Sequence, residues 1–404
     1  MNLERVRDVA TGKLYHLDPG PRIDGGEAFI FPVRGEPAIV AKIYRKDKRT
    51  SKDDVVRRAA KLSFMLENPP SASAVAKNHY PYAWPTALLA SPRGGTIVGF
   101  VMPRVRGMKE VFAFYNPAQR RQTCAFFNYR YLYQTARNIA GIMAEVHSKG
   151  YVVGDVNQKN IFVSDSALVT LLDTDSFQIH DPKSGLLHLC RVRTDGFIAP
   201  EVYRIGRDDV VRTVEQDLFG LSVLIFLLLM EGVHPFSCRY LGDGEPPKLQ
   251  QSVIAGAFPY GRRIAQYAPM PTALPFEILP PSLRSLFVRC FVDGHDEPSK
   301  RPTAKEWQMA LSKATDNLQT CTTNGQHVFG NHLGTECPWC VRVRLGLRDS
   351  FPSRIDEGPI NPTESIDEDP DTATRVGLFA RHKRIVWFAA AVLIVALIVL
   401  FGII

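Results

Sequence analysis

The sequence predicts an α+β globular body with three smaller segments behind it: a knuckle, a tether and a membrane helix. Three observations predict this order. Residues 1–316 show no break in composition, and the whole chain is 45% hydrophobic and 22% charged, as is usual for a protein with a buried core. Three cysteines and two histidines lie within the 20 residues that begin at Cys321. The last 20 residues carry no charge.

The charge distribution and the isolated cysteines exclude two other classes of protein. The net charge is +8, but Lys and Arg are scattered along the chain, so we expect no nucleic-acid partner. Four cysteines stand singly in apolar or mixed surroundings: Cys124, Cys190, Cys238 and Cys290. This pattern is typical of small buried residues in a reducing compartment and not of a disulfide framework.

The C-terminal segment predicts a membrane anchor. As a helix, residues 385–404 would span about 30 Å, which matches the hydrocarbon core of a bilayer. Residues 381–384 are basic, and basic residues stay on the cytoplasmic side. We therefore expect a single-pass protein of the inner (plasma) membrane with its globular body in the cytoplasm. Residues 343–384, acidic and rich in Pro, Ser and Thr in the middle, predict a disordered tether that ends in this basic juxtamembrane segment.

Two carboxylates and an asparagine follow a predicted helix that ends at Gly150. Asp155 and Asn160 lie on a polar loop between two short apolar segments, which should hold the loop in place. Asp173 comes 13 residues after Asn160, directly behind the apolar Leu171 and Leu172.

This series resembles the protein kinase superfamily. The catalytic loop of that family has an Asp and an Asn five residues apart, followed by a metal-binding Asp at the distance of Asp173. Further matches follow in order along the chain: Ala199-Pro200-Glu201 at the end of the activation segment, Asp217 at the start of an apolar helix, and Arg301, which we expect to pair with Glu201. The resemblance covers residues 14–315. It implies a two-lobed α+β protein-kinase fold and a divergent bacterial serine/threonine kinase of the eukaryotic-like type.

The N-terminal third resembles the nucleotide-binding lobe of the same family. Lys42 lies in an alternating strand, like the lysine that holds the α- and β-phosphates of ATP. Gly25 and Gly26 occupy the position of the phosphate-binding loop, although Ile23 and Ala28 stand where the family has its outer glycines.

Residues 96–105 resemble the strand that leads to the adenine. The resemblance implies that Met102 is the gatekeeper and that the backbone near Pro103 and Val105 meets the purine.

The resemblance also implies a role for each polar residue. ATP with Mg²⁺ would bind between the lobes, where Lys42 would orient the phosphates. Asn160 and Asp173 would hold Mg²⁺, and Asp155 would accept the proton of the attacking hydroxyl group. Lys159 stands near the family's lysine for the γ-phosphate. The implied function is transfer of the ATP γ-phosphate to serine or threonine hydroxyls of protein substrates in cytoplasmic signalling.

The chain departs from the family pattern at three places. Gly154 replaces the Arg before the catalytic Asp, so we expect no requirement for a phosphate on the activation segment. Thr174 and Asp175 replace the Phe and Gly after the metal-binding Asp, and Asp175 could be a second metal ligand or a polar residue capped by its neighbours. The acidic partner of Lys42 stays unassigned, because Glu67, the only Glu of the expected helix, lies at the helix end.

The cysteine and histidine cluster predicts a zinc site. Cys321, His327, Cys337 and Cys340 can place soft donors tetrahedrally around Zn²⁺, with His332 as the alternative histidine. Four protein ligands leave no open position, so the predicted role is structural. A redox Cys-x-x-Cys motif would need a thioredoxin-like fold around it, for which this segment is too short.

The predicted domains are a kinase N-lobe (1–106), a kinase C-lobe (107–316), a zinc knuckle (317–342), the tether (343–384) and the transmembrane helix (385–404). Two other functions remain open. One is a nucleotide-binding pseudokinase, suggested by the poor glycine loop and the missing helix Glu. The other is a membrane scaffold that acts through the zinc knuckle.

Overall fold

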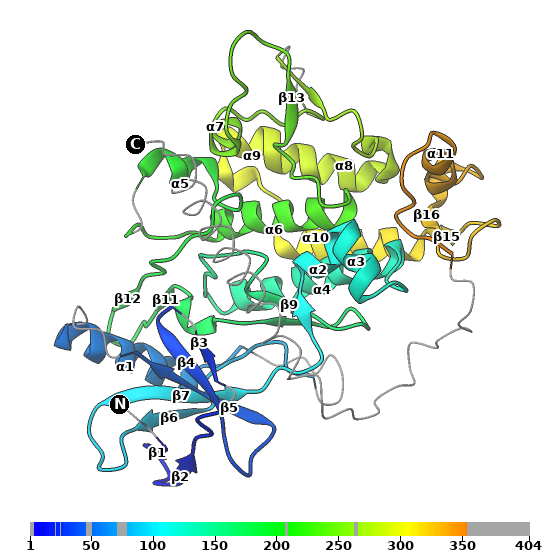
Figure 1. Cartoon of the computed structure of the whole chain (residues 1–404). Coiled ribbons are helices and arrows are strands. Elements are labelled where there is room, and N and C mark those ends of the chain that lie inside the picture. Colours follow the sequence, from blue (N-terminus) through cyan, green and yellow to red (C-terminus); the bar gives the residue numbers. More distant parts are fainter. Residues whose placement is uncertain are drawn as a thin grey trace, which may run out of the picture. The chain divides into compact units, whose positions relative to one another are not determined.

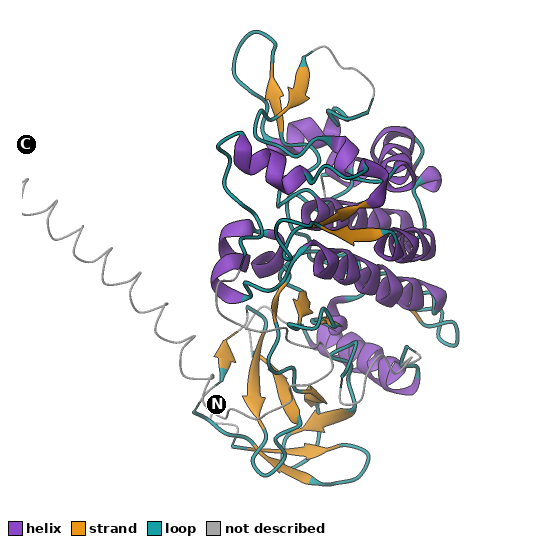
Figure 2. Cartoon of the chain, turned by 90° about the vertical axis from the view of Figure 1, so that its right-hand side faces the viewer, coloured by secondary structure: helices purple, strands orange, loops and turns teal. Residues whose placement is uncertain are grey.

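The computed structural model describes residues 4–20, 22–24, 26–45, 51–70, 79–206, 209–261 and 266–353 (Figure 1). Within these ranges no helix is both long and apolar enough to cross a membrane. The predicted membrane helix and the part of the tether beyond residue 353 lie outside the described residues. The described residues belong to one structural unit, which has a strand-rich N-lobe and a helix-rich C-lobe (Figure 2).

The N-lobe is an antiparallel sheet of seven strands in the order β2-β1-β6-β7-β5-β4-β3. Its strands are β1 Arg5–Asp8, β2 Leu14–His16, β3 Ile23–Asp24, β4 Ala28–Pro32, β5 Ile39–Tyr44, β6 Ala87–Ala90 and β7 Ile97–Pro103. Strand β5 lies between β7 and β4, so Lys42 pairs with Phe100 on one side and Ile30 on the other. This central place fixes the backbone of Lys42 on both sides.

One helix, α1 (Lys52–Glu67), packs against β6 and β7 of this sheet. It begins at a capping box in which Ser51 and Asp54 each accept a hydrogen bond from the other's backbone N–H. Leu62 and Met65 are its fully buried apolar residues. The helix therefore presents one turn of its face, around residues 61–65, to the interior of the lobe.

The C-lobe is built around α6 (Val214–Leu229). Every residue of α6 from Asp217 onward is buried, which confirms the prediction of a central C-lobe helix for this apolar run. Helix α4 (Tyr129–Ser148) packs on both α6 and α10 (Ala304–Asp316). The shorter helices are α2 Phe112–Tyr115, α3 Pro117–Thr123, α5 Pro200–Ile205, α7 Leu249–Ile254, α8 Pro281–Val288 and α9 Gly294–Asp296.

Short strands complete the C-lobe. A three-stranded sheet has the order β10-β9-β8, and two hairpins pair β11 with β12 and β13 with β14. Their bounds are β8 Lys109–Glu110, β9 Ile161–Val163, β10 Val169–Leu171, β11 Ile179–His180, β12 Leu187–His188, β13 Cys238–Tyr240 and β14 Tyr267–Pro269.

The predicted knuckle follows α10 directly. Strands β15 (Leu318–Thr320) and β16 (Val328–Gly330) pair, and α11 (Pro338–Arg344) lies beside them (Figure 1). The buried Trp339 ring stands edge-on to Tyr129 of α4, with ring centroids 5.0 Å apart. The knuckle is therefore packed on the C-lobe and not held apart from it.

The start of the predicted tether is wrong. Ser350 and Phe351 are buried, and the Phe351 ring lies 4.8 Å from that of Trp339. The guanidinium of Arg120 lies over the Phe351 ring, 4.6 Å from its centroid. The polar composition predicted disorder from residue 343. The contacts of Phe351 with Trp339 and Arg120 instead keep the chain packed on the C-lobe as far as Phe351.

Candidate active site

A β-hairpin brings two predicted metal-binding residues to one place. In the pairing of β9 with β10, Ile161 lies opposite Leu171. The N–H of Leu172 then donates to the carbonyl of Asn160 at 2.8 Å, so Asp173, the next residue, lies at the same end of the hairpin as Asn160. The backbone of Asp173 is left-handed, with φ of 53°, a conformation that is uncommon outside Gly and often found at functional sites.

The loop that carries Asp155 is supported by a buried carboxylate from α6. Asp217 accepts hydrogen bonds from the N–H groups of Val153 at 2.7 Å and Gly154 at 2.8 Å. The position expected for Asp217 beneath the catalytic loop is therefore confirmed. From the other side, Nδ2 of Asn160 donates to the carbonyl of Asp155 at 3.3 Å. The two ends of the loop are thus tied together.

The environment of Asp155 favours proton binding. Its side chain is partly buried, and this burial raises the pKa of the carboxyl group. Hydrogen bonds from Thr194 and Asn157 oppose the shift, while the negative charge of Asp173 adds to it. A carboxylate whose pKa is raised holds a proton more strongly, which suits a general base.

Lys42 reaches both acidic residues of the Asp-Thr-Asp segment. Its Nζ lies 2.5 Å from Oδ1 of Asp173 and 2.5 Å from Oδ1 of Asp175. Burial alone would lower the pKa of Lys42, but the two carboxylates outweigh burial and hold the pKa above its ordinary value. Lys42 is therefore charged although it is nearly inaccessible to water.

The two carboxylates differ in exposure. The side chain of Asp173 is 42% exposed, whereas that of Asp175 is 10% exposed. The second oxygen of Asp175 accepts a hydrogen bond from the hydroxyl of Tyr44 at 2.7 Å. Both oxygens of Asp175 are thus engaged by protein groups, and Asp173 has the more accessible carboxylate.

Helix α1 supplies a cation to this cluster. Lys61 is buried, and its Nζ donates to the backbone carbonyl of Asp175 at 2.6 Å. Burial lowers the pKa of Lys61 to about 8, although the charge of Asp175 opposes that effect. Sequence reasoning did not indicate Lys61, because a lysine inside a helical pattern normally points to solvent.

The activation segment ends in the ion pair that the sequence predicted. Arg301 donates through Nη1 and Nη2 to the two carboxylate oxygens of Glu201, each at 2.8 Å. This geometry is bidentate, the arrangement with the strongest hydrogen bonds between these groups. Arg301 is buried, so the pair fixes α5 to the end of the C-lobe.

Arg212 fills the space beside Gly154. A Cβ added to Gly154 would lie 3.4 Å from Cγ of Arg212 and 2.8 Å from Sγ of Cys190, so a larger residue would not fit. Arg212 is buried, and among the described residues its Nε and Nη2 find no hydrogen-bond partner. Its charge opposes the effect of burial on the pKa of Asp155. Sequence reasoning missed Arg212, which is far from Gly154 along the chain.

The residues predicted on the adenine and phosphate side lie in the N-lobe. Met102 is buried in β7 opposite Val40, and Val105 is partly exposed just beyond the strand. Gly26 is exposed in the turn between β3 and β4, next to the strand that carries Lys42. Gly25 lies outside the described residues.

The four predicted zinc ligands converge. One ligand atom from each of Cys321, His327, Cys337 and Cys340 lies within 4.8 Å of all the others. Nδ1 of His327 is 3.6 Å from Sγ of Cys337 and 3.4 Å from Sγ of Cys340. The sulfurs of Cys321 and Cys340 are 3.7 Å apart. His332 is exposed and lies near the carbonyl of Glu277 instead, so His327 is the histidine of the cluster.

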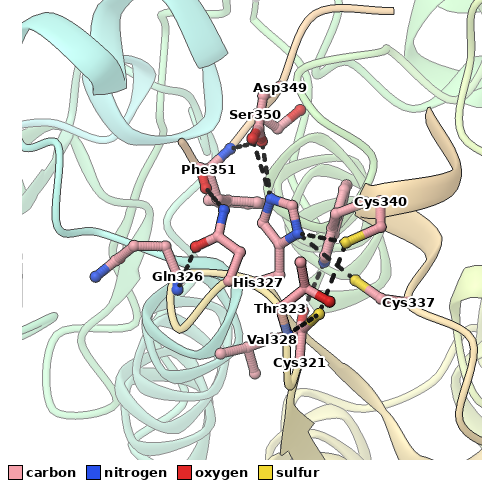
Figure 3. Close-up of polar contacts among 12 residues, drawn as sticks. Cys321, Thr323, Gln326, His327, Val328, Cys337, Cys340, Asp349, Ser350 and Phe351 are labelled. Carbon is pink, nitrogen blue, oxygen red and sulfur yellow. Dashed lines mark hydrogen bonds and ion pairs between the residues drawn. The ribbon is translucent and has the colours of Figure 1, made fainter. Parts of the chain in front are cut away.

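Asp349 orients the histidine of this cluster (Figure 3). Its carboxylate oxygens lie 3.0 Å and 3.2 Å from Nε2 of His327, which leaves Nδ1 facing the cysteines. The same carboxylate accepts a hydrogen bond from the N–H of Phe351 at 2.8 Å. Metal-ligating histidines commonly donate their second N–H to a carboxylate. The sequence did not indicate Asp349, which stood in the predicted tether.

No protein-family model matches the chain, but full sequences of known proteins do. The chain is 36% identical over 343 residues to the protein kinase YegI of Escherichia coli O157:H7, with 84% of this chain and 50% of that protein covered. It is also 36% identical over 326 residues to YegI of the K12 strain, with 80% and 48% covered. The chain is similar to protein kinases over most of its length.

The chain spans about half the length of these curated relatives. Among solved structures, the ROP18 kinase domain in complex with AMP-PNP and sucrose is 14% identical, with a TM-score of 0.48, and the match covers 78% of this chain and 86% of that one. In sequence the chain is similar to the protein kinase YegI over most of its own length, and its described residues form a two-lobed mixed α/β fold.

Proposed function

We propose that this chain is an ATP-dependent protein kinase that transfers the γ-phosphate to protein hydroxyl groups. The observation that carries the proposal is the convergence of four side chains from separate elements. Lys42 forms an ion pair with Asp173, which lies at the same end of the β9–β10 hairpin as Asn160. The side chain of Asn160 donates a hydrogen bond to the backbone carbonyl of Asp155. Phosphoryl transfer needs positioning and charge neutralisation, and these are the residue types that provide both.

Each residue would have one task. The amide oxygen of Asn160 and the partly exposed carboxylate of Asp173 fit Mg²⁺, which prefers oxygen ligands. Lys42 would orient the phosphates, and Asp155 would accept the proton of the substrate hydroxyl group. Lys159, which is exposed near this loop, is a further candidate for the γ-phosphate.

Serine or threonine is the proposed acceptor. The support for this acceptor is the resemblance of residues 14–315 to the eukaryotic-like serine/threonine kinases.

Phosphate transfer from labelled ATP tests the proposal. The purified chain should label itself or a generic protein acceptor, the labelled amino acids should be serine and threonine, and Asp155→Asn should abolish the signal. Asp165→Asn, a change at an exposed aspartate in the turn after β9, is the matched control. If the wild type binds ATP with Mg²⁺ but transfers nothing, the pseudokinase alternative replaces the proposal.

The proposed function includes a structural Zn²⁺. Zinc bond lengths of 2.3 Å to sulfur and 2.0–2.1 Å to nitrogen, at tetrahedral angles, put two sulfurs about 3.8 Å apart and a sulfur and a nitrogen about 3.6 Å apart. The distances of 3.7 Å between Cys321 and Cys340, and 3.4 and 3.6 Å from His327 to its two cysteines, match these values. Because the knuckle packs on α4, a structural role is better supported than a scaffold that acts through the knuckle.

The proposed location is the inner (plasma) membrane, with the kinase in the cytoplasm. The uncharged residues 385–404 behind the basic residues 381–384 support this location. Membrane fractionation tests it. The chain truncated after Ala380 should move to the soluble fraction, and equal fractionation of both forms would rule out the anchor.

A further inference from the structure

Helix α1 offers no carboxylate to Lys42. Its acidic residues are engaged elsewhere or face solvent: Asp54 caps the helix at Ser51, Glu67 lies 4.0 Å from the exposed Lys183, and Asp53 is exposed. The side chain that α1 does place in the cluster is Lys61, a cation. The acid that faces Lys42 must therefore come from another element.

Asp175 meets the requirements of that acid. It is one of two carboxylates at 2.5 Å from Nζ of Lys42, and it is the buried one. Its second oxygen is held by the hydroxyl of Tyr44, which lies on the same strand as Lys42. A carboxylate whose two oxygens are both bound to β5 has a fixed orientation toward Lys42.

The backbone of Asp175 is fixed as well. It lies in a 3₁₀ turn, Thr174–Ser176, and the hydroxyl of Thr174 donates to the carbonyl of Ala83 at 2.9 Å. Nζ of Lys61 donates to the carbonyl of Asp175 at 2.6 Å. Helix α1 thus contacts the phosphate-binding lysine through Asp175.

We propose that Asp175 is the positioning residue of Lys42, and that Lys61 holds Asp175 in place from α1. The inference rests on the proposed function, in which Lys42 binds the phosphates of ATP. It divides the tasks of the two acids: Asp175 keeps Lys42 in position, and Asp173, which has the more exposed carboxylate, binds Mg²⁺. Asp175 is then not a metal ligand.

Binding of a non-hydrolysable ATP analogue to the full chain, with and without Mg²⁺, separates these roles. Asp175→Asn should weaken binding about tenfold to a hundredfold in both conditions, because a charge-assisted hydrogen bond to Lys42 is lost. Asp173→Asn should weaken only the binding that depends on Mg²⁺. Asp165→Asn is again the control. If Asp175→Asn weakens binding only when Mg²⁺ is present, Asp175 is a metal ligand and the inference is overturned.

A double-mutant cycle checks that Asp175 acts through Lys42. Lys42→Met and Asp175→Asn together should weaken Mg²⁺-free binding no more than Lys42→Met alone, and additive losses would contradict the inference. Lys61→Met should reproduce part of the Asp175→Asn loss, and no loss at all would remove Lys61 from the assignment. Unfolding midpoints of all variants show whether a loss reflects misfolding.

The readout is binding, so the outcome is independent of phosphate transfer. A chain that binds the analogue as expected but transfers no phosphate keeps Asp175 as the positioning residue and loses the proposed kinase activity. A chain that does not bind the analogue loses both.

Discussion

The candidate active site and the Cys/His cluster proposed to bind zinc (the zinc cluster) are both built from charged or metal-binding side chains, but they are assembled over different distances in the sequence. Lys42 and Asp175 are 133 residues apart, whereas Cys321 and Cys340 are 19 apart. The spacing alone predicted that the three cysteines and one of two nearby histidines lie close together, and the structure brings His327 to the cysteines. The partner of Lys42 depended on how a helix, a strand and a turn pack together.

The two sites also balance charge differently. The active-site cluster holds two buried lysines and two carboxylates, so it is neutral without any ligand. The zinc cluster has three cysteine sulfurs and one imidazole nitrogen, and these ligand atoms are held together by a bound cation. Removal of one side chain should therefore weaken function only in part at the candidate active site, whereas it should largely abolish metal binding at the zinc cluster.

The largest effect is expected at the zinc cluster. Cys337→Ser together with Cys340→Ser removes two of four ligands, so bound zinc should fall from one per chain to none. The lost metal-binding free energy is about 10 kcal/mol for structural zinc sites, and the unfolding midpoint should fall with it. Elemental analysis and thermal unfolding measure both.

His332→Ala is the control for that experiment, because His332 lies outside the cluster. Zinc that persists in the double cysteine variant would break the assignment of the ligands. Zinc that is lost from the His332 variant would reopen the choice of histidine.

The next effect is expected at Asp155. Asp155→Asn removes the proton acceptor and should lower kcat by about 10²- to 10⁴-fold. ATP binding should stay close to wild type, because Asp155 contacts no nucleotide-binding residue other than through its loop. Steady-state kinetics measures kcat, and nucleotide titration measures ATP affinity. A loss of ATP affinity alongside the loss of kcat would show that the variant disturbs the whole loop.

A smaller effect is expected at Asp349. Asp349→Asn weakens the hydrogen bond that orients His327, and zinc affinity should fall about 10- to 100-fold while the cluster still binds one ion. Competition with a zinc chelator measures the shift. Asp316→Asn, an exposed aspartate at the end of α10, is the control. An unchanged affinity would mean that the four ligands suffice without outer support.

Lys61 predicts a pH dependence of stability. Burial lowers the pKa of Lys61 to about 8, whereas an unfolded chain has a lysine pKa of about 10.4. Between these values the unfolded state binds more protons, so the free energy of unfolding rises with pH. Below about pH 8 the folded protein carries the full cost of a buried charge, and this cost is relieved as pH rises.

Lys61→Met removes this titration. From about pH 7.5 to pH 9.5 the wild type should gain about 1–3 kcal/mol relative to the variant, as measured by urea unfolding. Lys52→Met, at an exposed lysine of the same helix, should follow the wild type. Parallel curves for the wild type and Lys61→Met would show that Lys61 does not titrate in this range.

No effect is expected from removal of phosphate on the activation segment. Gly154 replaces the usual arginine, and Thr194 already bonds Asp155. Phosphatase treatment should leave activity within about twofold, since no phosphate-dependent contact is required. The Arg212→Met variant extends this test. If the wild type regains activity only after rephosphorylation and Arg212→Met does not regain it, Arg212 is the residue that binds the phosphate.

The sequence by itself predicted the order of the candidate catalytic residues, the Glu201–Arg301 pair, the place of Asp217, and a cluster of three cysteines with one of two histidines. Each rests on a spacing or motif that leaves little freedom once the elements form. The N-terminal strands β1 and β2, which extend the sheet beside β6, were not predicted, because strands of four and three residues are too short to show a clear period of two.

Tertiary structure decided which groups meet across the chain. Lys61 was turned inward by the packing of α1, Asp175 was buried by the turn after Asp173, and Arg212 was placed against Gly154 by the segment before α6. Asp349 became part of the zinc cluster because Phe351, two residues on, is held by Trp339 and Arg120. In each case a buried polar group needs a partner, and only the packed fold determines which group is near enough to be that partner.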